Sequence, residues 1–221
     1  MATKLSPQTQ SMELAVFNLP AVIRYDKKVL RNCLLSAIND LFGTSYNRKD
    51  LKWQGTCSEI LVATTLELFN REPTEKEVEE VSQRFTQNVK IEFIKDDDLL
   101  EIRPGVQSVF RHMERKKNIK YVIVSDFWAP VTHFMLQSCG VFSKDKYTLT
   151  ADEGVGPRGQ LKKLLKKSNK FSSKTEILYI NGNKKKEEFL GRHIHMGKKA
   201  GKDNYFTYPK FSDMMKQLRK S

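Results

Sequence analysis

The chain has 221 residues, of which 39% are hydrophobic, so it is long enough to bury a large core. Its formal net charge is +13, which favours an acidic partner. No run approaches the roughly eighteen consecutive apolar residues of a membrane helix, and residues 1–11 are polar. We therefore expect neither a membrane span nor a signal peptide.

The three cysteines are Cys33, Cys57 and Cys139, an odd number spread far apart. This spacing argues against a disulfide framework and against a zinc site. Free thiols are typical of a reducing compartment. We expect an intracellular protein, in the cytoplasm, with an organelle as the alternative.

The first predicted element after a flexible lead, residues 1–11, is a buried strand over residues 13–18. Its apolar run leads directly into a turn signal at Asn18 and Pro20. In a parallel sheet covered by helices, ligands sit at the carboxyl ends of the strands. The loop 18–21 is therefore the predicted site.

Three predicted helices follow, over residues 27–42, 58–69 and a third that begins after Thr74. Apolar residues recur at three and four positions in each, and Gly43 is placed to end the first. Thr74 and Glu77 form a capping box for the third. No convincing strand interrupts them, which predicts an all-helical insertion over residues 27–97.

After residue 97 short β-branched runs alternate with helical patterns. This alternation predicts a three-layer α/β/α core with a parallel, Rossmann-like sheet, because each crossover between parallel strands needs a helix. The predicted domains are a core of residues 12–26 and 98–221 and a helical cap of residues 27–97. The predicted strands and helices of this part are 104–117 (helix), 121–124 (strand), 130–138 (helix), 147–151 (strand), 159–167 (helix), 177–180 (strand), 183–190 (helix), 193–196 (strand) and a helix from 212.

The order of these elements resembles the haloacid dehalogenase (HAD) superfamily, in the branch of phosphoglycolate-phosphatase-like proteins with a helical cap after the first strand. Local matches are residues 102–106 before a helix, and residues 121–125 and 177–180 at strands. The resemblance implies a phosphate-handling fold and a Mg²⁺ cofactor.

The resemblance also implies two aspartates at the end of the first strand, a nucleophile and a general acid/base. Here Asn18 and Pro20 stand at these positions. A neutral amide is a poor nucleophile, and a proline side chain cannot transfer a proton. Both chemical roles are therefore missing from the motif.

The family's phosphate-binding Ser/Thr corresponds to Ser125, and its charge-stabilising lysine to Arg158, with Lys162 as the second choice. Its acidic magnesium ligands fall at Gly182 and Lys186, within a run of three lysines that includes Lys184 and Lys185. Mg²⁺ prefers anionic oxygen ligands and is repelled by ammonium groups. We expect no metal and no cofactor, with magnesium retained only if the chain is a hydrolase.

Three further patterns each allow two interpretations. Asp126 is either a residual base or a cap of the helix near Pro130, and the helix cap is favoured. The Phe127–Trp128 pair is either a stacking platform or core packing, and core packing is favoured. His193 and His195 share one face of a strand, and a structural or anion-facing pair is favoured over a metal site because lysines surround them.

The positive charge lies entirely in the last third of the chain. Residues 1–153 hold 21 Lys+Arg against 21 Asp+Glu, and residues 154–221 hold 18 against 5, a difference of 13. This pattern predicts a non-catalytic binding or structural component that contacts nucleic acid or a ribonucleoprotein. The residues expected to do so are Lys162, Lys163, Lys166, Lys167, Lys170, Lys184, Lys185, Lys186, Lys198 and Lys199.

Several alternatives to this interpretation stay open. The lysines could form only a solvated surface, or could contact an acidic protein. The chain could also be a phosphatase with displaced catalytic groups, or a sensor of a phosphorylated ligand.

Overall fold

A computed structural model describes residues 13–47, 55–115, 119–141, 148–153, 159, 161–164, 176–181, 192–196 and 206–208. In chain order the elements are β1 (Glu13–Asn18), α1 (Leu19–Val22), β2 (Ile23–Tyr25), α2 (Lys27–Phe42), α3 (Cys57–Phe69), α4 (Glu75–Lys95), η1 (Asp97–Leu99), β3 (Leu100–Ile102), α5 (Val106–Arg115), β4 (Ile119–Val124), α6 (Ala129–Ser138), β5 (Thr148–Leu149), η3 (Ala151–Glu153), β6 (Glu176–Asn181), β7 (Arg192–Met196) and β8 (Phe206–Tyr208).

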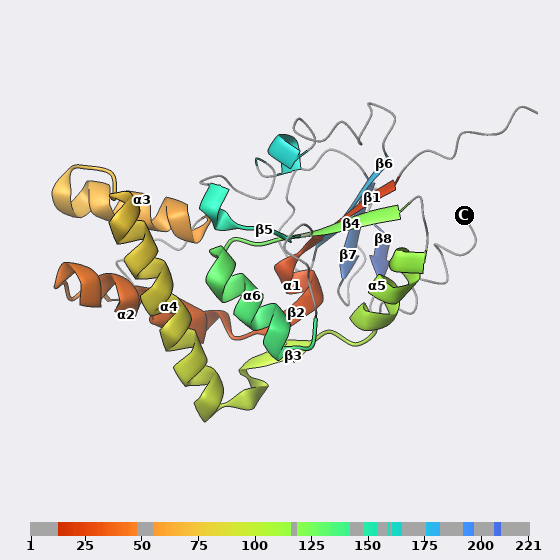
Figure 1. The fold of residues 1–221 in the computed structure, drawn as a ribbon, viewed down its shortest axis with the longest axis horizontal. Coiled ribbons are helices and arrows are strands. Elements are labelled where there is room, and N and C mark those ends of the chain that lie inside the picture. Colours follow the sequence, from red (N-terminus) through yellow and green to blue (C-terminus); the bar gives the residue numbers. More distant parts are fainter. Residues whose placement is uncertain are drawn as a thin grey trace, which may run out of the picture.

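The main sheet of the described residues has six strands in the order β5-β4-β1-β6-β7-β8, and all its neighbouring pairs are parallel. β1 lies inside the sheet, between β4 and β6 (Figure 1). This confirms the predicted parallel α/β sheet.

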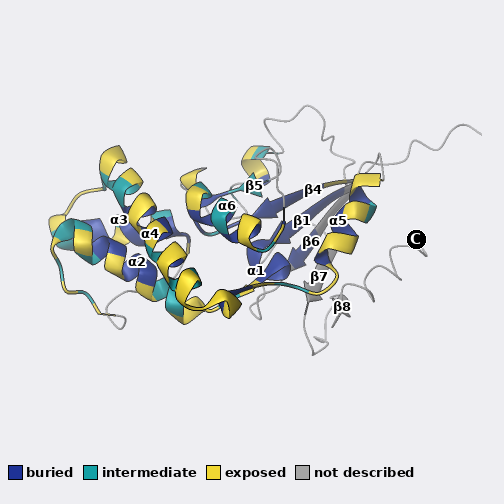
Figure 2. Ribbon diagram, turned by 60° about the horizontal axis from the view of Figure 1, so that its bottom comes forward, coloured by how far each residue is buried: buried dark blue, intermediate teal, exposed yellow. Residues whose placement is uncertain are grey.

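Side chains alternate between the two faces of this sheet, and each face packs on its own helices. Ala15 and Phe17 belong to a cluster with residues of α5 and α6. Leu14 and Val16 belong to a second cluster that contains Leu161, from the short helical segment 161–164. Because successive strand residues point to opposite faces, one buried strand holds helices on both sides. The result is the predicted three-layer arrangement, with the strands in the buried centre (Figure 2).

The three helices α2, α3 and α4 lie to one side of the sheet and form the helical insertion (Figure 1). β2 precedes α2 and pairs antiparallel with β3, which follows α4. The chain therefore leaves and returns to the core through a two-stranded connection. Three-residue strands carry too little periodicity to be predicted from sequence, and both were missed.

Local capping explains where these helices begin and end. The predicted capping box of Thr74 and Glu77 is present at α4, and Thr56 and Glu59 form another at α3. Gly43 ends α2 with a φ of 63°, a left-handed conformation that glycine adopts without a Cβ penalty. The helix predictions for 27–42, 58–69 and the segment after Thr74 are confirmed.

The helical insertion is joined to the core by direct hydrogen bonds. Cys57 N donates to Asp126 O at 2.8 Å. The Ser58 hydroxyl donates to Ala151 O at 2.7 Å and accepts from Trp128 Nε1 at 2.8 Å. Phe127 and Trp128 are almost completely buried, and both rings contact Phe85 of α4. The prediction that the Phe127–Trp128 pair packs in the core is confirmed.

Other predictions differ in detail or lie outside the described residues. Residues 19–22, expected as loop, form the helical turn α1. β5 is shorter than predicted, and β8 was not predicted at all. The helices over 183–190 and from 212 lie outside the described residues. The domain boundaries stay a prediction.

Among the described helices, none has both the length and the apolar composition needed to cross a membrane.

We expect Ser58→Ala to lower the free energy of unfolding by about 1–3 kcal/mol, because it leaves the Trp128 indole N–H buried without its partner. Urea denaturation followed by circular dichroism measures this. Ser36→Ala is the matched control, because its exposed hydroxyl makes only a 3.4 Å contact with Asp40. If the two substitutions lowered the free energy of unfolding equally, Ser58 would not be a stabilising link between the insertion and the core.

Candidate functional site at the carboxyl edge of the sheet

The carboxyl ends of β1, β4 and β6 meet at one edge of the sheet. Asn18 lies opposite Val124 in the β1–β4 register, and Phe17 lies opposite Ile180 in the β1–β6 register. Parallel pairing therefore brings Asn18, Ser125 and the end of β6 to the same edge. This is the edge at which the sequence predicted a site.

Asn18 is buried, with 4% of its surface exposed. Its Oδ1 accepts a hydrogen bond from Ala21 N at 3.1 Å, so the side chain caps α1. Asparagine is among the preferred residues at this position, because its oxygen satisfies an N–H of the first turn. Pro20 fits the same turn, since an N–H would have no partner there. Both residues that replace the expected aspartates thus have a structural role.

Arg103, the residue directly after β3, contacts the same turn. Its Nε donates to Pro20 O at 2.6 Å, and its backbone N donates to Val22 O at 2.9 Å. Burial lowers the pKa of Arg103, and the nearby Arg24 adds to this, but a guanidinium starts so high that it stays charged at neutral pH. Arg103 was not predicted to be a site residue. Its position directly before Pro104-Gly105 was the available signal.

Ser125 is also buried, with 1% of its surface exposed. Its Oγ accepts from Phe127 N at 3.1 Å and lies 2.8 Å from Thr132 Oγ1. Its backbone N donates to Leu149 O at 2.8 Å. The hydroxyl predicted to bind phosphate is therefore engaged in holding the turn that leads into α6.

A group of titratable side chains lies where the helical insertion meets this edge. Burial raises the pKa of the Tyr25 hydroxyl, and the charge of Asp126 adds to this shift. Burial likewise raises the pKa of the Cys57 thiol, with Asp126 and then Asp152 as the further causes. Asp126 is thus a carboxylate at the carboxyl edge, beside two groups that stay neutral.

Asp152 supplies a second carboxylate near this junction. Its Oδ2 accepts from Ala129 N at 2.7 Å, in the first turn of α6, and also from the Thr150 hydroxyl. These bonds fix the carboxylate against the helix terminus. Asp152 was not singled out from the sequence, because its role depends on β5 lying beside β4.

Only two of the predicted lysines fall in the part of the chain that the structure describes. Lys162 and Lys163 are exposed on the helical segment 161–164. His193 and His195 lie in β7, opposite Tyr179 and Asn181. The other predicted residues, Arg158, Lys166, Lys167, Lys170, Gly182, Lys184, Lys185, Lys186, Lys198 and Lys199, lie outside the described residues.

The turn formed by Asn18 and Pro20 fits a magnesium ion poorly. Mg²⁺ prefers several oxygens in octahedral geometry, usually including one or two carboxylates. The Asn18 oxygen accepts from Ala21 N, and the Pro20 carbonyl accepts from a guanidinium. A fixed cation at this turn disfavours a second one.

Several solved structures have a fold similar to that of this chain. CbbY from Rhodobacter sphaeroides, in complex with phosphate, matches with a TM-score of 0.58 and 12% identity, over 92% of this chain and 96% of that one. A HAD hydrolase of family IA, variant 3, from Entamoeba histolytica HM-1:IMSS gives a TM-score of 0.56 at 11% identity, over 91% and 95%. A predicted phosphoglycolate phosphatase from Haemophilus somnus 129PT gives 0.54 at 14% identity, over 94% and 98%.

The chain has the haloacid dehalogenase fold. The matches extend over almost the whole of both chains in each case, so the HAD fold includes the helical insertion as well as the sheet. The low identities establish the HAD fold alone. No family model matches the chain, and no curated protein does.

The raised thiol and phenol pKa values predict a loss of stability in alkaline solution. Burial raises the pKa of Cys33 and of Cys139 from 9.0 to about 11, and it raises those of Cys57 and Tyr25 as well. The unfolded chain therefore releases these protons at lower pH than the folded chain. The contribution of these groups to the free energy of unfolding should be constant below about pH 9 and should fall as the pH rises from about 9 through about 11.

Urea midpoints measured across this pH range test the expectation. Cys57→Ala is the diagnostic variant, because it should make the alkaline fall less steep whatever its effect on stability at neutral pH. A fall of the same steepness in both proteins would contradict the assignment of Cys57.

Proposed function

We propose that this HAD-fold chain is a catalytically inactive binding or structural component, which contacts nucleic acid or a ribonucleoprotein through its basic C-terminal third. The observation that supports inactivity most directly is the environment of Asn18. Its neutral carboxamide is buried at the end of β1 and holds α1. An amide in this role offers no attacking anion.

Arg103 and the helical insertion add to this support. The guanidinium binds the Pro20 carbonyl at the position where the family's acid/base group is expected. Cys57 N binds the Asp126 carbonyl, so the insertion is joined to the loop that follows Ser125. The polar groups of this edge are used to hold the fold together.

The proposed binding function follows from the charge distribution. The whole excess of 13 positive charges lies after residue 153. Lys162 and Lys163 are exposed, as a phosphate contact requires. Each phosphate that a lysine neutralises releases counterions, which drives binding at low salt.

A phosphatase with displaced catalytic groups is the second candidate. Asp126 favours it, because this carboxylate lies at the carboxyl edge beside Ser125. Two proteins of similar fold were solved with relevant ligands: CbbY with phosphate, and the HAD hydrolase YfnB with magnesium. The two candidates differ in a simple assay.

We expect the purified chain to hydrolyse an aryl phosphate no faster than the buffer blank in the presence of Mg²⁺. Asn18→Ala and Asp126→Asn are assayed beside it. Turnover that Asn18→Ala abolishes would contradict inactivity. Turnover that only Asp126→Asn abolishes would establish the displaced phosphatase.

We expect binding to duplex DNA to weaken about a thousandfold or more between about 50 mM and about 200 mM salt if six or more phosphates are contacted, and binding to a single strand to weaken somewhat less. Fluorescence anisotropy with a labelled oligonucleotide measures this. Lys162→Glu with Lys166→Glu should weaken binding far more than Ser125→Ala does.

The matched control is Lys28→Glu with Lys76→Glu, which makes the same change of charge at exposed positions of the neutral part of the chain. If both double variants lose the same binding affinity, net charge alone explains the effect. Binding that ignored salt, or that vanished only with Ser125→Ala, would refute the role of the lysines.

A further inference from the structure

A groove of about 360 Å³ lies between the start of α4 and the start of α6, and we call it the α4–α6 groove. Its volume is within the range of small-ligand pockets, about 300–1,000 Å³. The groove bridges the helical insertion and the core, because α4 belongs to the first and α6 to the second. Nothing in the proposed function uses it.

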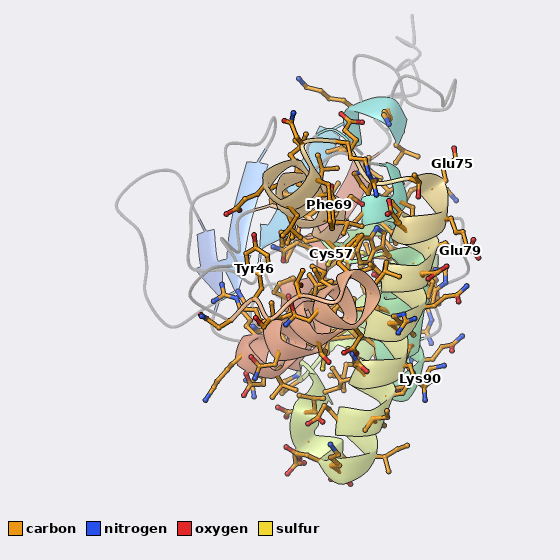
Figure 3. The ribbon with its side chains drawn as sticks, turned by 90° about the vertical axis from the view of Figure 1, so that its left-hand side faces the viewer. Tyr46, Cys57, Phe69, Glu75, Glu79 and Lys90 are labelled. Carbon is orange, nitrogen blue, oxygen red and sulfur yellow. The ribbon has the colours of Figure 1, made fainter. Side chains whose placement is uncertain are left out.

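Three carboxylates line the α4–α6 groove: Glu75, Glu79 and Asp152. Figure 3 shows Glu75 and Glu79 near the start of α4, where their four-residue spacing places them on one side of the helix. Glu79 Oε1 accepts from Gln83 Nε2 at 3.0 Å, which leaves its second oxygen for a ligand. Asp152 is held in place by Ala129 N. The acidic lining is thus partly fixed before any ligand binds.

The positive ends of two helices reduce this negative charge but do not cancel it. α4 and α6 both begin at the groove, and a helix N-terminus carries roughly half a positive charge. Three carboxylates against two such ends leave about two negative charges. The α4–α6 groove therefore favours a cation, in a chain that is basic overall.

The rest of the lining is apolar except for two polar side chains. Val78, Trp128 and Pro130 supply the apolar surface. An inorganic cation gains nothing from such surface, whereas an aliphatic chain does. A ligand that matches the whole lining carries both a positive charge and a short hydrocarbon segment.

Ser82 adds an unsatisfied hydroxyl to the wall of the groove. It lines the groove, only 6% of its surface is exposed, and its Oγ is buried without a hydrogen-bond partner. An unsatisfied buried hydroxyl costs roughly 1–3 kcal/mol, so such groups call for an explanation. A serine side chain has three staggered positions, so its hydroxyl can turn toward an ammonium group in the groove.

We propose that the α4–α6 groove binds an alkylammonium ion. The carboxylates receive the ammonium group, the apolar wall contacts the methylene groups, and Ser82 supplies a hydrogen-bond acceptor. This chemistry is shared by a free aliphatic amine and by a lysine side chain of a peptide.

The test is an NMR titration of the full-length chain with butylammonium, and separately with a lysine residue capped at both ends. We expect shifts of the backbone amides of Glu79, Gln83 and Ala129, and no such shifts with 1-butanol, which lacks the charge. Stronger binding of butylammonium indicates a free amine as the ligand, and stronger binding of capped lysine indicates a peptide. The absence of shifts with both overturns the proposal.

Glu75 and Glu79 are exposed, so substituting them tests binding without disturbing the fold. Glu75→Gln with Glu79→Gln should weaken binding about threefold to tenfold. Ser82→Ala should weaken it roughly threefold without lowering stability, because it removes a hydroxyl that has no partner. Glu80→Gln is the matched control on the same helix, since Glu80 pairs with Lys76 outside the groove. Binding that survives the double glutamate change unaltered overturns the proposal.

Discussion

The structure depends on the burial of β1 on all sides. This strand pairs with β4 on one edge and β6 on the other, and its two faces contribute to two separate hydrophobic clusters. A parallel strand in this position has its backbone hydrogen bonds and its side chains satisfied by neighbours. Its carboxyl end is then the fixed point from which α1, β2 and the helical insertion start.

That fixed end is occupied by groups that stabilise one another. Asn18 caps α1, Arg103 binds the Pro20 carbonyl, and Ser125 holds the turn before α6. In an enzyme, the polar groups at such an edge must be available to a substrate, and buried partners make them unavailable. The proposed inactivity therefore rests on where the hydrogen bonds go, as well as on which carboxylates the motif lacks.

The insertion and the core are held together at a second junction, around Ser58 and Trp128. The Ser58 hydroxyl links the Trp128 indole to the Ala151 carbonyl, and Phe85 packs on the same indole. The α4–α6 groove lies beside this junction and shares Trp128 and Asp152 with it. If the groove and the basic third both bind as proposed, the chain carries a local acidic site and a separate basic surface. The Debye length of about 8 Å at physiological salt allows such opposite charges to act separately.

The sequence alone determined the features that depend on local patterns. The spacing of apolar residues predicted β1, α2, α3 and α4, and the Thr74–Glu77 capping box predicted where α4 begins. The alternation of strands and helices predicted the parallel sheet. It also predicted a site at Asn18, because ligands sit at the carboxyl ends of parallel strands.

Only the tertiary structure decided what those residues contact. The roles of Arg103, Ser58 and Asp152 arise from hydrogen bonds across 83, 93 and 23 residues of chain, respectively, and no local pattern encodes such distances. The strands β2 and β3 are similarly stabilised by each other across the whole insertion. Local propensity acts within a turn or two of the chain, whereas these bonds form only after the sheet and the helices have brought distant segments together.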